Sequence, residues 1–206
     1  MKHTWTKLEI DALTEFFNLG LGRAAASLNE LSGQNIDLHT PHIEFCPTKE
    51  ILKHVHTKEG ELIISVKIEF DGVIYGDGFL IFPEEEGLKL VGIIIGESTS
   101  QEERATYLED TLNEVGNIIL NACLSSFCDT LSFTLDTSVP IYSKDDHAGF
   151  IKKLGQVETS VGIVAQVEFK LHLSDITGHI IIFMEQGSIS SLRVKIAEFV
   201  REVSPD

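Results

Sequence analysis

DALTEFFNLG, residues 11–20, and DTLNEVGNII, residues 110–119, are two versions of one sequence that lie 99 positions apart. They share an Asp, a Leu, a Glu and an Asn at matched positions, and a Pro follows each copy at the same distance. The pattern D-x3-E-x2-N-x22-P therefore occurs twice, as Asp11, Glu15, Asn18 and Pro41, and as Asp110, Glu114, Asn117 and Pro140. A pattern that recurs at a fixed offset predicts an internal structural repeat.

The segments around the two copies predict the same order of elements in each half: helix, short strand, strand, strand, helix. Apolar residues at helical spacing predict long helices over about 6–31, between Thr6 and Gly33 as caps, and over about 102–131. β-branched runs predict strands at 61–70, 76–83, 161–170 and 178–185, and helices follow at 83–95 and 188–200. We expect a single α/β domain of the α+β type over residues 1–206, with repeats at about 6–97 and 98–203.

The polar residues of the pattern share one face of each long helix. Each residue turns an α-helix by about 100°, so positions 11, 15, 18 and 22 fall within about 60° of one another, as do 110, 114, 117 and 121. Asn lowers helix propensity, and its use twice beside a matched Glu indicates a function. The opposite faces are expected to pack in the core through Leu13, Phe16, Phe17, Gly20, Ala24, Leu28 and Leu31, and through Leu112, Val115, Ile119, Cys123 and Phe127.

Charge and hydropathy argue against several classes of protein. The chain has 32 acidic against 16 basic residues, a net charge of −16, which disfavours binding to nucleic acid or to an anionic membrane. The charged N-terminal stretch lacks the apolar core of a signal peptide, and the longest apolar run, residues 90–96, is too short to span a bilayer. We therefore expect a cytoplasmic protein.

Neither a metal site nor a disulfide is expected. Cys46, Cys123 and Cys128 contain no CxxC motif and predict buried thiols in a reducing compartment. The pair His54 and His56 has no acidic or thiol partner at a known ligand spacing. Residues 143–150, with two acids and a His, are expected to form a solvated loop between strands.

The doubled pattern, in a chain of 206 residues, resembles the CheC/CheX/FliY family of chemotaxis phosphatases. Two copies without an added domain are most similar to the CheC branch of that family. Its members dephosphorylate the response regulator CheY, so the resemblance implies a phosphatase that acts on the aspartyl phosphate of a CheY-like regulator. It also implies a central antiparallel sheet with two exposed long helices. No cofactor of the chain's own is expected, and Mg²⁺ is expected on the regulator.

The resemblance implies that Glu15 and Glu114 contact the regulator and that Asn18 and Asn117 act in hydrolysis. An amide suits the second role because it is uncharged and can both donate and accept hydrogen bonds, and can thus hold a water in line with the leaving oxygen. A carboxylate beside the phosphoryl oxygens would be repelled, whereas one turn away it can pair with a Lys of the regulator. A carboxylate acting as general base is the less favoured alternative.

The remaining positions of the two faces are candidate binding residues. Asp11 and Asp110 are either first-turn acids that favour the helix dipole or docking contacts. Gly22 leaves room for a partner, and Asn121 occupies the matching position in the second helix. Many relatives carry a small residue just before the motif Asn; Gly116 fits that rule and Phe17 does not.

Two other functions stay open at this point. One is a binding module that regulates a CheD-like deamidase or a response regulator with little or no catalysis. The other is a phosphatase for a receiver domain outside chemotaxis. Asn replacement would separate catalysis from binding, because binding alone does not need the amide.

Overall fold

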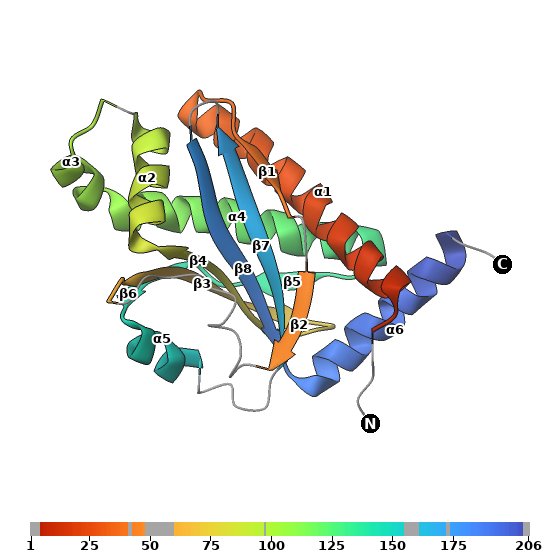
Figure 1. Ribbon diagram of the computed structural model, residues 1–206. Coiled ribbons are helices and arrows are strands. Elements are labelled where there is room, and N and C mark those ends of the chain that lie inside the picture. The colour runs from red at the N-terminus through yellow and green to blue at the C-terminus, as the bar shows by residue number, and fades with distance from the viewer. Residues whose placement is uncertain are drawn as a thin grey trace.

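The computed structural model describes residues 5–40, 43–47, 60–96, 98–154, 161–171 and 174–203. The first half contains α1 (Lys7–Ser32), β1 (Asp37–His39), β2 (Ile43–Pro47), β3 (Ile63–Gly72), β4 (Gly76–Pro83) and α2 (Glu84–Ile95). The second half contains α3 (Gln101–Thr106), α4 (Leu108–Leu131), β5 (Leu135–Thr137), β6 (Ile141–Asp145), α5 (His147–Leu154), β7 (Val161–Leu171), β8 (Ser174–Met184) and α6 (Gln186–Val203). Figure 1 shows these elements arranged around the sheet.

One antiparallel sheet connects the two halves of the chain. Its order is β1-β7-β8-β4-β3-β5, with β2 also paired to β7 and β6 to β3. The early strands β1 and β2 therefore pair with the late strand β7, and β5 and β6 pair with β3. In the centre, β4 pairs with β8, with Gly76 opposite Met184 and Ile81 opposite His179. The expected antiparallel sheet with long helices is confirmed, and the division of the chain into two repeats remains a prediction.

Alternating side chains of the central strands fill two separate cores. In β8, Ile180 and Ile182 belong to the large core and Ile181 and Phe183 to the small one, as the two-residue period of a strand requires. The large core lies between one face of the sheet and α1, α2, α4 and α6. The small core lies on the other face, under Phe150 and Leu154 of α5. The four helices on one face leave the outer surfaces of α1 and α4 uncovered by the sheet.

Helix α1 begins and ends where its capping residues predict. Thr6 and Glu9 form a capping box, with Thr6 Oγ1 accepting from the Glu9 N–H and the Glu9 carboxylate accepting from the Thr6 N–H. Gly33 ends the helix in the left-handed conformation, at φ 68°. Ser132 ends α4 in the same conformation, at φ 54°, although it has a side chain. The two long helices thus share one type of C-terminal cap.

The predicted second helix is two helices. Ser100 and Glu103 form a capping box that starts the short α3, and Tyr107, at φ −92° and ψ 4°, interrupts the helix before α4. Arg104 holds α3 against α2, because its Nε donates to Thr99 and its guanidinium lies over Gly92. Arg104 thus attaches α3 to the preceding helix α2, and α4 begins separately at Leu108.

Other expectations are wrong in detail. Residues 143–150 are the end of β6 and the start of α5: Asp146 accepts from the Gly149 N–H and so caps a helix that buries Phe150. Leu31 is 48% exposed, because the last turn of α1 extends past the surface that buries Leu28. Gly20 lies on the core face of α1, where it packs against α4 rather than against the sheet.

Candidate functional site

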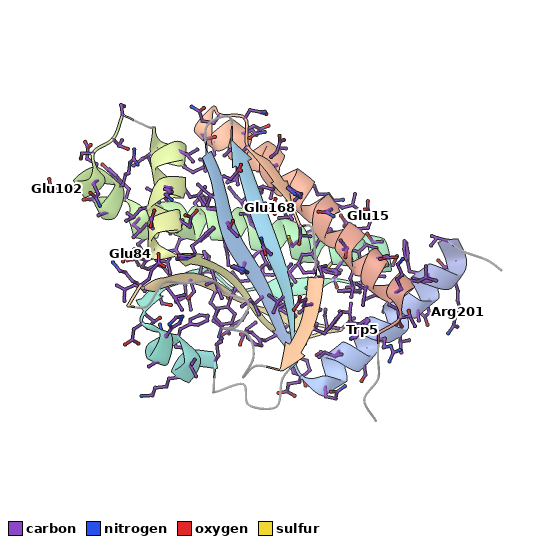
Figure 2. The ribbon with its side chains drawn as sticks, viewed as in Figure 1. Trp5, Glu15, Glu84, Glu102, Glu168 and Arg201 are labelled. Atoms are coloured by element: carbon purple, nitrogen blue, oxygen red, sulfur yellow. The ribbon has the colours of Figure 1, made fainter. Side chains whose placement is uncertain are left out.

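The two sets of motif residues lie on the outer surfaces of α1 and α4. We call Asp11, Glu15, Asn18 and Gly22 the α1 stripe, and Asp110, Glu114, Asn117 and Asn121 the α4 stripe. In each stripe the carboxylate residues are exposed and the motif Asn is half-buried. Figure 2 labels Glu15 on α1. Each stripe therefore offers acidic groups beside a partly sheltered motif amide, and the α4 stripe adds the half-buried Asn121.

The amide of Asn18 is held by the backbone just after β1. Its Oδ1 accepts a hydrogen bond from the Thr40 N–H at 3.0 Å, and Thr40 is 3% exposed. A backbone N–H can only donate, so the oxygen of the Asn18 amide must face Thr40. The NH₂ group is therefore turned away from Thr40.

The amide of Asn117 is held by a neighbouring side chain. Asn121 Nδ2 lies 2.8 Å from Asn117 Oδ1 and 2.9 Å from the Asn117 main-chain oxygen. The counterpart of Asn121 on α1 is Gly22, which is exposed and has no side chain to offer. Both motif amides are thus held through Oδ1, by a backbone N–H in the case of Asn18 and by a side-chain amide in the case of Asn117.

Buried contacts fix α1 and α4 relative to the core. Phe17, which departs from the family rule, is 0% exposed and packs edge-on against Phe127, so it does not lie on the α1 stripe. Its counterpart Gly116 lets α4 approach β3, since a Cβ there would come within 2.5 Å of Val66 Cγ1. At this position of the repeat, the size of the side chain therefore suits the local packing: Phe17 packs on Phe127, and Gly116 leaves room for Val66.

An ion pair anchors the N-terminal end of α1 on α6. Arg193 Nε lies 3.0 Å from Glu9 Oε1, and the Arg193 guanidinium also faces the Trp5 ring. Burial acts to raise the pKa of Glu9, but hydrogen bonds from Thr6 and Arg193 outweigh it, and the pKa is lowered overall. Glu9 is therefore held as a carboxylate and serves the structure rather than the stripe.

Sequence reasoning missed two groups beside the stripes. The Thr40 N–H was missed because the contact joins residues 22 positions apart. Asn113 lies one turn before Asn117, and its buried Oδ1 has no hydrogen-bond partner among the described residues. The spacing of Asn113, Asn117 and Asn121, four residues apart each time, would have predicted a row of amides on α4.

The described ranges contain no group of three or more His, Cys, Asp or Glu residues that could hold a metal ion. His54 and His56 lie outside those ranges, as does Pro41, while Pro140 directly precedes β6. Burial raises the pKa of the Cys123 thiol to about 12, whereas Cys128 is only half-buried and Cys46 has no described side chain.

Among the described helices, none is long and apolar enough to cross a membrane.

Solved structures define the class of this fold. FliY from Thermotoga maritima matches with a TM-score of 0.73 over 95% of this chain and 99% of that chain, at 14% identity. The CheX–CheY–BeF3–Mg²⁺ complex from Borrelia burgdorferi matches with a TM-score of 0.51 over 81% of this chain and 96% of that chain, at 18% identity. The chain therefore has the fold that FliY and CheX share.

Sequence comparison leads to a particular relative. No family model matches the chain. The CheY-P phosphatase CheC of Bacillus subtilis (strain 168) is 22% identical over 199 residues, which cover 91% of this chain and 93% of that protein. The expected resemblance to the CheC/CheX/FliY family is confirmed.

Proposed function

We propose that this chain is a phosphatase that hydrolyses the aspartyl phosphate of a CheY-like response regulator. The observation that carries the proposal is the pair of half-buried amides, Asn18 and Asn117, each fixed through its oxygen and each one turn from an exposed Glu. The resemblance to a CheY-P phosphatase and to CheX, which was solved with CheY, supports this choice of substrate.

The reaction needs a positioned water more than a strong base. An aspartyl phosphate is an activated acyl phosphate, and phosphoryl transfer passes through a loose transition state. The water oxygen forms a bond to phosphorus as the bond from phosphorus to the Asp oxygen breaks. The regulator recovers its carboxylate, and both protons of the water leave with inorganic phosphate. An Asn NH₂ group that donates to the water oxygen would hold it in line for this attack.

Glu15 and Glu114 are proposed as docking groups. Each is exposed and lies one helical turn from its Asn, which places it beside, rather than over, a phosphoryl group that the Asn approaches. A carboxylate in that place can pair with a Lys of the regulator and set the register of the helix. Asp11 and Asp110, also exposed, extend the acidic surface by another turn.

The chain is proposed to work without a cofactor of its own. Mg²⁺ would be bound by the regulator, where it neutralises charge on the phosphoryl oxygens. The residues of the stripes would then supply only orientation and docking.

The test is phosphate release from a CheY-like regulator that has been phosphorylated in the presence of Mg²⁺. Wild type, Asn18→Ala, Asn117→Ala and the double variant are compared. We expect wild type to accelerate release, the double variant to be inactive, and the single variants to rank the two stripes. Acceleration that survives in the double variant would overturn the proposal.

The same variants test the alternative of a non-catalytic binding module. If wild type releases no phosphate while a regulator or a CheD-like deamidase binds wild type and double variant equally well, the chain is a binding protein. Binding that is unaffected by loss of both amides would show that the amides do not serve recognition.

A further inference from the structure

Asn121 makes two hydrogen bonds that together fix the orientation of two side chains. Its Nδ2 donates to the main-chain oxygen of Asn117, which can only accept, so the nitrogen of Asn121 must face Asn117. The same nitrogen donates to Asn117 Oδ1, so the oxygen of the Asn117 amide must face Asn121. The main-chain oxygen of Asn117 therefore determines the orientation of both the Asn121 and the Asn117 side-chain amides.

We infer that Asn121 is a positioning residue for Asn117: it keeps the Asn117 NH₂ group turned toward the partner and away from α4. This inference rests on the proposed function and adds a residue to it. Without the donor of Asn121, the Asn117 amide could turn over and present its oxygen in place of its nitrogen. A water bound there would then meet the amide oxygen in place of the NH₂ group that is proposed to hold it in line.

The α1 stripe reaches the same result without a second amide. There the Thr40 N–H supplies the donor to Asn18, and the position that matches Asn121 is Gly22. Val139, which matches Thr40, is 78% exposed, whereas Thr40 is 3% exposed. The contrast explains why Asn occurs at position 121 and Gly is sufficient at position 22.

The test uses chains in which only the α4 stripe is active. In an Asn18→Ala background, Asn121→Leu removes the donor at similar size and without charge, and Asn121→Asp replaces it with an acceptor. We expect both changes to lower kcat roughly ten- to a hundredfold, because orientation of the attacking water is lost. We expect KM for the phosphorylated regulator to stay within about twofold, because Asn121 acts on Asn117 and not on docking.

The matched controls are Ser125→Leu and Ser125→Asp in the same background. Ser125 is exposed and lies one turn further along α4, so it receives the same new side chains and the same added charge at a position that has no part in the hydrogen bonds between the two amides. We expect both controls to keep the kcat of the background. Circular dichroism and thermal unfolding of all the variants establish that each one is folded.

The outcomes separate the inference from the proposed function. A double variant, Asn18→Ala with Asn117→Ala, that still releases phosphate would overturn the proposed function. If that variant is inactive but folded Asn121→Leu keeps the kcat of its background, the positioning role is wrong. It is also wrong if the Ser125 controls lower kcat as much as the Asn121 changes, or if the Asn121 changes act on KM alone.

Discussion

Gly20 of α1 lies directly against the backbone of Cys123 in α4. A Cβ at position 20 would come within 2.6 Å of the Cys123 Cα and 2.8 Å of the Ala122 carbonyl oxygen. Two residues further along, a Cβ at Gly22 would meet nothing within 4 Å. The two helices that carry the stripes are therefore in backbone contact at one point, and that contact fixes one stripe relative to the other.

The two glycines predict opposite responses to the same substitution. Gly20→Ala should lower the free energy of unfolding by about 1–3 kcal/mol, because the overlap is with backbone atoms that cannot move alone. Gly22→Ala should raise it by about 0.5–1 kcal/mol, because Ala restricts the unfolded chain and fits an exposed helix. Urea unfolding measures both, and a Gly20→Ala variant as stable as Gly22→Ala would contradict the close contact.

The C-terminal caps of α1 and α4 predict a second pair of opposite effects. Ser132 has φ 54°, a conformation that costs residues with a side chain more than Gly. Ser132→Gly should stabilise the protein by roughly 1 kcal/mol, and Gly33→Ala should destabilise it by about the same amount. Ser132→Ala is the control, since it removes the hydroxyl but keeps the strain. Equal gains from Ala and Gly at position 132 would show that the backbone conformation is not the cause.

Glu9 predicts a pH-dependent stability. Its pKa is lowered in the folded protein, since hydrogen bonds from Thr6 and Arg193 outweigh burial, so its contribution is present above the ordinary pKa of a Glu and is lost as the pH falls through the folded value. Glu9→Gln should cost about 1–3 kcal/mol at pH 7, and the difference from wild type should shrink at acidic pH below about 4. Urea unfolding across pH measures it.

Glu30→Gln is the matched control for that experiment, because Glu30 is an exposed residue of the same helix. It removes the same charge, and we expect a change within about 0.5 kcal/mol. A pH-independent loss in Glu9→Gln would mean that packing, rather than the charge held by Arg193, stabilises this end of α1.

The proposed roles of Glu114 and Asn117 predict a split between KM and kcat. In an Asn18→Ala background, Glu114→Gln should raise KM for the phosphorylated regulator by about three- to tenfold, because it weakens docking. The kcat should be nearly unchanged. Asn117→Ala in that background should lower kcat by about a hundredfold or more. Steady-state phosphate release measures both. A fall in kcat with unchanged KM for Glu114→Gln would instead favour Glu114 as a general base.

The parts of the fold that the sequence predicts are those specified by neighbouring residues. The run 76–83 matches β4 (Gly76–Pro83), and Thr6, Glu9 and Gly33 bound α1 because caps act within one turn. The single helix expected over 102–131 fails for a different reason. It is interrupted at Tyr107, and the short α3 packs against α2 through Arg104 and Gly92, a tertiary contact that the helical period does not encode.

For the candidate site, helical spacing places the stripe residues on their helices but not their partners. Glu15 and Glu114 are exposed, as the helical wheel predicts. The bond from Thr40 to Asn18 brings a backbone group from the sheet edge to α1, and only the fold brings these groups together. The bond from Asn121 to Asn117 is local, and its spacing of four residues was visible in the sequence. The sequence did not reveal that Asn121 is the donor and Asn117 the acceptor in this bond.

The pairing of β1 and β2 with β7, and of β5 and β6 with β3, means that each half of the chain completes the sheet of the other. A fragment that ended after α2 would keep the α1 stripe but lose β7, the strand against which β1 is placed, and with it the position of the Thr40 N–H beside Asn18. The two helices that carry the proposed chemistry therefore do not fold independently. If both stripes are active as proposed, we expect loss of one amide to leave the other stripe working, whereas loss of a strand from either half should inactivate both stripes.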